Sequence, residues 1–175
     1  MTRATEPNVP PPSDRRAAGD DFEFTSAVDG SLRTTVESLF FFNPAQPALI
    51  ESIRKSVEEF GVPQIVERGD RICLGIPARD AQCLFACDRA QQPPGPVGVV
   101  LYLRTTPHLL RILHLAVSPA YADDGPLFDR GLALRLVDEV RALGRRISGV
   151  RRIQLPYRAR AFLSVVERGE APRGR

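Results

Sequence analysis

The sequence predicts an α/β (α+β) domain in which helices flank a mixed, mostly antiparallel central sheet. Two segments near the start show the apolar spacing of amphipathic helices, and short β segments separated by turn residues follow them. A strand–helix–strand unit over residues 109–157 completes the pattern. Short links between consecutive strands indicate antiparallel pairing, whereas a crossover helix indicates one parallel pair.

The length of 175 residues suits one ordinary globular domain, and the hydrophobic fraction of 43% suits a buried core. We expect a disordered tail over residues 1–20, a folded domain over 21–157, and a basic tail or short helix over 158–175. The first segment lacks the apolar core of a signal peptide, and no apolar run approaches the roughly 18 residues of a membrane span. We therefore expect a cytoplasmic protein that does not bind a membrane.

Cysteine spacing and charge limit the other classes of function. Cys73, Cys83 and Cys87 lack the spacing of a zinc site, so we expect buried structural thiols and no metal. The net charge is +3, and arginine dominates the chain from Arg141 onward. This region is either a site for a phosphate-bearing ligand or ordinary solvated surface, because Lys55 is the only lysine. No aromatic residues interleave with the arginines, so nucleic acid is not the expected partner.

The first predicted elements are a strand and two helices. Residues 21–28 alternate weakly in polarity and predict a strand, and residues 31–42 predict a helix with Ser31 as its N-cap. A second amphipathic helix over residues 47–60 ends at Gly61.

Short β segments follow. Residues 64–67 and 71–76 predict a hairpin, and further strands are predicted over 82–88 and 97–104. The next strand, Leu109–Val117, is apolar on both alternating faces apart from Arg111 and His114, so we place it in the middle of the sheet. The last two elements of the unit are a helix over residues 130–144 and a strand over residues 151–155.

The start of the predicted helix near Arg130 is a candidate ligand site. Free backbone N–H groups at a helix N-terminus bind anions, and Gly131 and Ala133 are small enough for a ligand to approach closely. The preceding loop is acidic, and Asp129 is placed to cap the helix.

A family resemblance rests on three stretches of this unit. They read Leu113-His114-Leu115-Ala116-Val117-Ser118-Pro119, then Arg130-Gly131-Leu132-Ala133, then Ile153-Gln154-Leu155. These stretches resemble the Gcn5-related N-acetyltransferase (GNAT) superfamily. The resemblance implies an acyl-CoA N-acyltransferase-like fold that binds acetyl-CoA. The backbone of Leu115, Ala116 and Val117 would then hold the acetyl and pantetheine portions, and the pyrophosphate would bind at Arg130, Gly131, Leu132 and Ala133.

The chain also differs from the family pattern in two places. Phe128 stands where the phosphate loop usually has Arg or Gln, and the chain after residue 157 is short for the helix and two strands that usually follow. We predict one short amphipathic helix that includes Phe162 and Val165. An unpaired sheet edge would then be covered by a second copy of the chain or by a partner protein.

Acetyl transfer to an amine requires removal of a proton from the amine and protonation of the leaving thiolate. His114 is the candidate base because histidine titrates near neutrality, and its alternative role is a packed residue of the central strand. Tyr157 is the candidate acid, or else an aromatic residue at the sheet edge. The leading hypothesis is an acetyl-CoA-dependent N-acetyltransferase that acts by direct transfer to a small-molecule or peptide amine. The alternative is a non-catalytic GNAT-fold protein that serves as a binding or assembly module.

Overall fold

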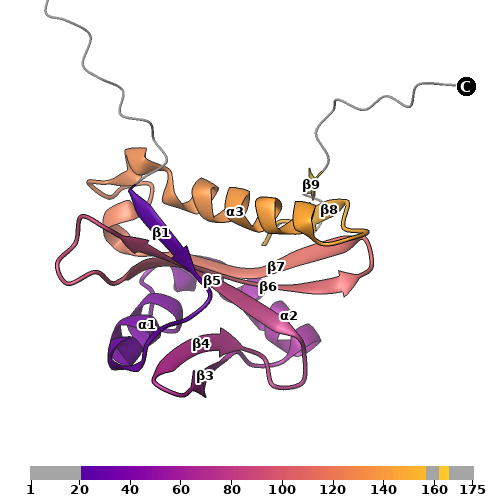
Figure 1. The fold of residues 1–175 in the computed structure, drawn as a ribbon, viewed down its shortest axis with the longest axis horizontal. Coiled ribbons are helices and arrows are strands. Elements are labelled where there is room, and N and C mark those ends of the chain that lie inside the picture. Colours follow the sequence, from indigo (N-terminus) through magenta and orange to yellow (C-terminus); the bar gives the residue numbers. More distant parts are fainter. Residues whose placement is uncertain (1–20, 157–161, 166–175) are drawn as a thin grey trace, which may run out of the picture.

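The computed structural model describes residues 21–156 and 162–165, and it has the predicted mixed, mostly antiparallel sheet flanked by helices (Figure 1). The main sheet has six strands in the order β1-β5-β6-β7-β8-β9, and a smaller sheet has three in the order β2-β4-β3. Among the described strands, β7 and β8 form the one parallel pair, as the crossover helix predicted. The tail predicted at residues 1–20 lies outside the described residues.

The strand boundaries are close to those expected from the alternation of polar and apolar residues. The main sheet contains β1 (Phe22–Thr25), β5 (Ala81–Asp88), β6 (Pro96–Thr106), β7 (Leu109–Val117), β8 (Arg152–Gln154) and β9 (Phe162–Ser164). The smaller sheet contains β2 (Val28–Asp29), β3 (Gln64–Arg68) and β4 (Arg71–Gly75). The predicted hairpin is the β3–β4 pair.

Three α-helices carry the amphipathic faces, and short 3-10 turns adjoin them. The α-helices are α1 (Arg33–Phe40), α2 (Ile50–Phe60) and α3 (Leu132–Arg146). The 3-10 turns are η1 (Gly30–Leu32), η2 (Gln46–Leu49), η3 (Pro119–Tyr121) and η4 (Phe128–Arg130). Gly61 ends α2 as predicted, with φ of 102° and its N–H donated to the carbonyl of Val57.

The helices cover opposite faces of the main sheet. Helix α3 packs on one face, and α1, α2 and the smaller sheet lie on the other (Figure 1). Strand β7 contributes to both cores: Leu110 and Ile112 pack with α3, whereas Leu113 and Ala116 belong to the core on the α1 side. The prediction of a central strand that is apolar on both faces is therefore confirmed.

Two predicted helix starts differ from the observed starts by two residues. Helix α3 begins at Leu132 rather than at residue 130, because Gly131 adopts a left-handed conformation with φ of 59° after the η4 turn. Asp129 is therefore not at the N-cap position. At the other start, the carboxylate of Asp29 accepts the N–H of Ser31 at 2.9 Å, so Asp29 is the capping residue and Ser31 is not.

The two ends of the described chain also differ from prediction. The single strand expected over residues 21–28 is divided into β1 and β2, which belong to different sheets. The helix expected near the C-terminus is wrong where the chain is described, since Phe162–Ser164 forms strand β9 against β8. Pairing with the backbone of β8 favours this extended conformation over a short, weakly stable helix. Strand β9 is thus the strand at that end of the sheet, and its association with a second chain remains a prediction.

The remaining expectations concern thiols, metals and membranes. Cys73, Cys83 and Cys87 are free, the first two are buried, and burial raises the pKa of the Cys83 thiol to about 12. No cluster of three or more metal-ligating side chains occurs among the described residues. No helix in the described part of the chain is long and apolar enough to cross a membrane.

Candidate functional site

The candidate site begins where β8 stops pairing with β7. Their parallel ladder ends at Arg111 opposite Gln154, whereas β7 continues to Val117. The N–H of Ser118 donates to the carbonyl of Val97 in β6 at 2.7 Å. Backbone groups of successive residues in a strand point in opposite directions, so the N–H and C=O groups of Leu115 and Val117 point away from β6. After Arg111, where the ladder with β8 ends, the edge of β7 opposite β6 therefore carries backbone groups that do not pair with β8.

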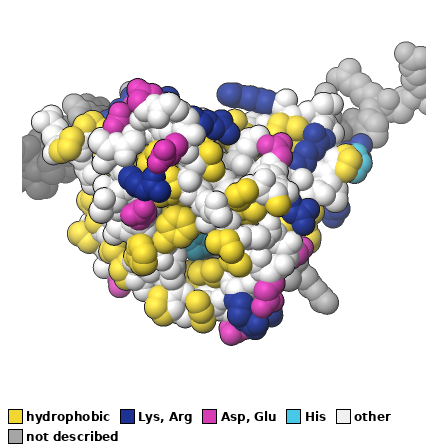
Figure 2. All heavy atoms as spheres, turned by 90° about the horizontal axis from the view of Figure 1, so that it is seen from below, with side chains coloured by type: hydrophobic (Ala, Val, Ile, Leu, Met, Phe, Trp, Pro, Cys, Tyr) yellow, Lys and Arg dark blue, Asp and Glu magenta, His cyan; other side chains and the backbone are white. Residues whose placement is uncertain are grey.

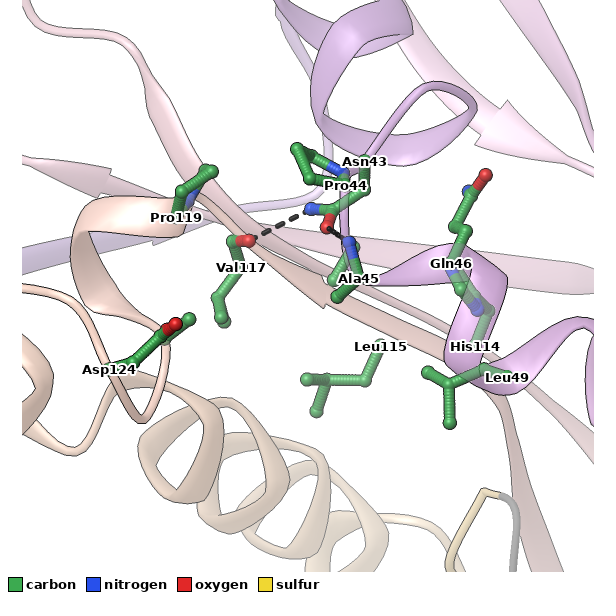
Figure 3. Close-up of a pocket in the computed structure, with 12 residues that line it drawn as sticks. Asn43, Pro44, Ala45, Gln46, Leu49, His114, Leu115, Val117, Pro119 and Asp124 are labelled. Atoms are coloured by element: carbon green, nitrogen blue, oxygen red, sulfur yellow. Dashed lines mark hydrogen bonds between the residues drawn. The ribbon is translucent and has the colours of Figure 1, made fainter.

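A cavity of about 290 Å³ lies along this part of β7. It is bounded by the segment between α1 and α2 and by the loop that follows β7 (Figure 3). Its lining consists of Asn43, Pro44, Ala45, Gln46, Leu49, His114, Leu115, Ala116, Val117, Pro119, Ala122 and Asp124. Four residues that the sequence indicated, His114 and the stretch from Leu115 to Val117, are thus brought together in one cavity.

Hydrogen bonds of Asn43 hold the α1–α2 side of the cavity wall against β7. Its buried side-chain amide donates to the carbonyl of Val117 at 2.9 Å (Figure 3). The same amide donates to the carbonyl of Leu39 at 3.1 Å. Its side-chain oxygen accepts the N–H of Ala45 at 3.0 Å. One side chain therefore joins the end of α1, the α1–α2 segment and the end of β7.

The lining chemistry is mostly apolar. Asp124 is the charged side chain among the described lining residues, and Figure 3 shows it across the cavity from Gln46. An apolar cavity with one carboxylate suits a ligand that combines an apolar body with a cationic or hydrogen-bonding group. Asp124 was noted in the sequence as part of an acidic loop, and its position in the cavity depends on how that loop folds.

His114 lies in the cavity wall but does not titrate near neutrality, contrary to the expectation from the sequence. Its side chain is buried, and its ring meets the Phe40 ring edge-on with centroids 4.8 Å apart. Burial lowers the pKa of His114 to about 4, so the imidazole is neutral at physiological pH. This environment matches the alternative role, a histidine packed within the central strand.

Arg130 does not point toward the proposed phosphate site. Its guanidinium lies 2.6 Å from the carboxylate of Asp88 and 3.2 Å from that of Asp21. It also stacks over the Phe22 ring at 4.5 Å and lies near the Tyr121 ring. In this structure two carboxylates on the β1–β5 side therefore bind the cation, and the cofactor role of Arg130 remains a prediction.

The contacts among Arg130, Asp88 and Tyr121 also shift the pKa values of Tyr121 and Asp88. Burial and the hydrogen bond that its hydroxyl donates to Asp88 raise the pKa of Tyr121 to about 12. Burial alone would raise the pKa of Asp88, but hydrogen bonds from Tyr121, the Ala90 N–H and Arg130 lower it overall. Asp88 therefore stays ionised at neutral pH, and Tyr121 anchors the loop through its hydrogen bond to Asp88.

The first turn of α3 lies after this anchored loop. Gly131 is the N-cap residue, and a glycine has no side chain that could cap the helix by a hydrogen bond. A Cβ at Gly131 would meet no atom within 4 Å, so the space beside its backbone is open. The N–H groups of Leu132 and Ala133 belong to the first turn and have no intrahelical acceptor. These three residues do not line the cavity, and the predicted acid Tyr157 lies outside the described residues.

Sequence reasoning missed Asn43 and Gln46 as parts of the cavity wall. Asn43 and Pro44 have the composition of a turn between two helices, which gives no indication of a contact with β7. The hydrogen bond between Asn43 and Val117 joins residues 74 positions apart. Local patterns therefore contained no signal for it.

Comparison with known proteins gives only weak likenesses, all to solved structures. No family model matches the chain, and no curated protein is significantly similar to it. Among solved structures, an acetyltransferase from Streptococcus agalactiae is similar over 78% of this chain and 73% of that chain, with 16% identity and a TM-score of 0.38. At this identity and TM-score, the likeness does not establish an activity.

Proposed function

We propose that the protein is an acetyl-CoA-dependent N-acetyltransferase of the GNAT type that transfers the acetyl group directly to an amine. The main support is the cavity along β7 beyond the end of the β7–β8 ladder. An arm that contains amides can bind such a strand edge through main-chain hydrogen bonds, in the way that a peptide adds to a sheet. Pantetheine is an arm of this kind, and the resemblance of residues 113–119 to the family supports the same assignment.

In the proposed reaction the amine nitrogen forms a bond to the thioester carbonyl carbon, the C–S bond breaks, and the amine proton is lost as the thiol forms. We assign to Asp124 the attraction of the acceptor's ammonium group, because it is the charged side chain among the described lining residues. His114 contributes a neutral ring to the wall, since a pKa of about 4 makes it too weak a base to hold the amine's proton. The apolar lining limits water around the thioester.

The pyrophosphate would bind at the start of α3 through the N–H groups of Gly131, Leu132 and Ala133. The Gly131 N–H already donates to the carbonyl of Phe128 at 3.0 Å, so the first-turn N–H groups carry most of this assignment. Arg130 adds no free cation because it binds Asp88 and Asp21. We therefore expect weaker CoA binding than a loop with a free arginine would give.

A second function, a non-catalytic binding or assembly module, is favoured by a specific pair of observations. Arg130 is held by two carboxylates, and burial keeps His114 neutral far below physiological pH. Both residues therefore serve the packing of the fold in this structure. Association through the β9 end of the sheet belongs to this alternative, and light scattering at high protein concentration would test it.

Calorimetric titration of acetyl-CoA into the folded protein tests whether the proposed cosubstrate binds. We expect saturable binding that Gly131→Asp abolishes and Gly131→Asn retains. Both substitutions tolerate the left-handed backbone and have nearly the same size, so their difference reports the added negative charge. No heat at millimolar acetyl-CoA would reject the transferase, and equal affinities of the two variants would reject the phosphate site.

Turnover distinguishes the transferase from the binding module. Release of free thiol from acetyl-CoA in the presence of a panel of amines would support transfer. Asp124→Asn should then raise the KM for a cationic acceptor with little change in acetyl-CoA affinity, because the carboxylate attracts the acceptor. Saturable CoA binding without thiol release for any amine would favour the binding module.

A further inference from the structure

We propose that a second, apolar cavity beyond His114 receives an apolar group of the ligand bound along β7, of the size of a phenyl ring or a chain of about six carbons. The inference rests on the proposed function, since it names the class of substrate that the same site would take. It predicts either an acyl chain longer than acetyl or an acceptor amine with a bulky apolar body.

The second cavity has a volume of about 190 Å³ and lies where α1 and α2 pack over the main sheet. Most of its wall is apolar and comes from both helices, from β7 and from residues near β4, including Phe40, Ile53, Val57, Ile76 and Leu113. A dry apolar cavity of about 150 Å³ is large enough to bind benzene. This cavity is therefore of a suitable size for one ring or a short chain.

The two cavities are neighbours that share part of their walls. Gln46 and His114 line both of them. The Gln46 amide is hydrogen-bonded to the carbonyl of Phe40, and the His114 ring packs edge-on against the Phe40 ring. A ligand in the first cavity would therefore enter the second past His114 and Gln46.

The chemistry of the second cavity selects against charge. Its described lining contains no Asp, Glu, Lys or Arg, and its polar side chains are Gln46, Ser56 and His114. Three charged residues of α2, Glu51, Arg54 and Glu58, form ion pairs with each other on the exposed face of that helix. An ammonium group would therefore stay near Asp124, and the apolar end of the ligand would enter beyond His114.

The surface view agrees with this arrangement. Figure 2 shows the face formed by α1, α2 and the smaller sheet, where hydrophobic side chains surround a hollow in which a histidine side chain is visible. Charged side chains lie mainly toward the edges of this face (Figure 2). This face therefore presents an apolar surface around the hollow.

Two probes distinguish the sources of the apolar group. Calorimetry would compare hexanoyl-CoA with acetyl-CoA, and 2-phenylethylamine with ethylamine. If the cavity takes the acyl chain, hexanoyl-CoA binds at least about tenfold more tightly than acetyl-CoA. If it takes the acceptor, 2-phenylethylamine shows the corresponding advantage over ethylamine.

A filled cavity provides the control. Ser56→Phe adds a ring from the cavity wall and should remove the advantage of the larger probe while leaving acetyl-CoA affinity unchanged. Lys55→Phe adds the same ring to α2 at an exposed position that does not line the cavity, and it should keep the advantage.

The outcomes separate this inference from the proposed function. If acetyl-CoA binds but neither larger probe gains affinity, the inference is wrong and the proposed function stands. A different result is that 2-phenylethylamine binds, Ser56→Phe abolishes this binding, and no CoA thioester binds. In that case the cavity assignment stands and the proposed transferase function is wrong. Failure of every probe to bind the folded protein overturns both.

Discussion

The guanidinium of Arg130 lies 2.6 Å from the carboxylate of Asp88, and the Asp88 side chain is only 3% exposed. This ion pair joins the loop after β7 to strand β5. The loop that would bind a phosphate is thus fixed to the sheet by the cation that the sequence assigned to the phosphate itself.

Removing one partner of this pair should destabilise the protein. Arg130→Met retains apolar packing on Phe22 but leaves the buried Asp88 without its cation, and we expect a loss of roughly 3 kcal/mol in the free energy of unfolding. Urea denaturation measures it. Adding Asp88→Asn should restore much of the loss, because no charge then remains buried.

The matched control for this substitution is Arg54→Met. Arg54 pairs with Glu51 and Glu58 on the exposed face of α2, and solvent-exposed pairs of this kind contribute little to stability because water screens them. Similar losses for Arg130→Met and Arg54→Met would contradict the structural role of the Asp88 pair.

Burial of His114 should make stability depend on pH. Its folded pKa of about 4 lies below its ordinary value of 6.5, so the unfolded chain binds the proton more tightly. The free energy of unfolding should therefore fall as pH drops from 6.5 toward 4, by at most about 3 kcal/mol from this residue. Above that window its contribution is complete.

Comparison with His114→Gln isolates this effect, because carboxylates also titrate at low pH. Denaturation curves recorded across the window should show a smaller decrease for the variant than for the wild type. Parallel pH profiles would mean that the pKa of His114 is the same in the folded and unfolded protein, which would contradict the effect of burial.

Gly125 should be irreplaceable in the loop that precedes α3. A Cβ at this position would overlap the carbonyl oxygens of Pro119 and Ala120, which are backbone atoms of the same compact loop. We expect Gly125→Ala to cost at least about 2 kcal/mol and to weaken ligand binding in the cavity. Gly95→Ala is the control: a Cβ there meets nothing within 4 Å, so thermal melting should be almost unchanged.

Asn43 should matter for both stability and the shape of the site. Asn43→Ala leaves the carbonyls of Leu39 and Val117 without their side-chain donor, at a cost of about 2 kcal/mol. Asn43→Asp should cost more, because a carboxylate has no N–H to donate and faces two carbonyl oxygens. Denaturation midpoints measure the stability of the two variants relative to the wild type. An Asn43→Asp variant as stable as the wild type would refute the predicted order of stability.

The sequence predicted those parts of the fold that depend on local periodicity. Alternation located β7 at the residues where it occurs, and helical spacing identified α2 and α3 within a few residues of their observed ends. The resemblance also selected the residues of β7 that line the cavity. These signals are short-range properties of one strand or one helix.

The remaining features depend on contacts between distant residues. Arg130 and Asp88 are 42 positions apart, and no pattern in the loop indicates which direction the guanidinium takes. The burial that lowers the pKa of His114 comes from helices elsewhere in the chain, such as the one that carries Phe40. The fold class was therefore predictable, whereas the chemistry of the site required the structure.

The division of the first predicted strand into β1 and β2 has a consequence for protein synthesis. Phe22 pairs with Asp88 in one sheet, and Val28 pairs with Ile72 in the other. Chains emerge from the ribosome at about 5–20 residues per second, so the start of the domain waits several seconds for its partners. A translational pause after residue 75 and before residue 88 has emerged would leave β1 without its native neighbour, whereas β2 could already pair with β4 in the smaller sheet.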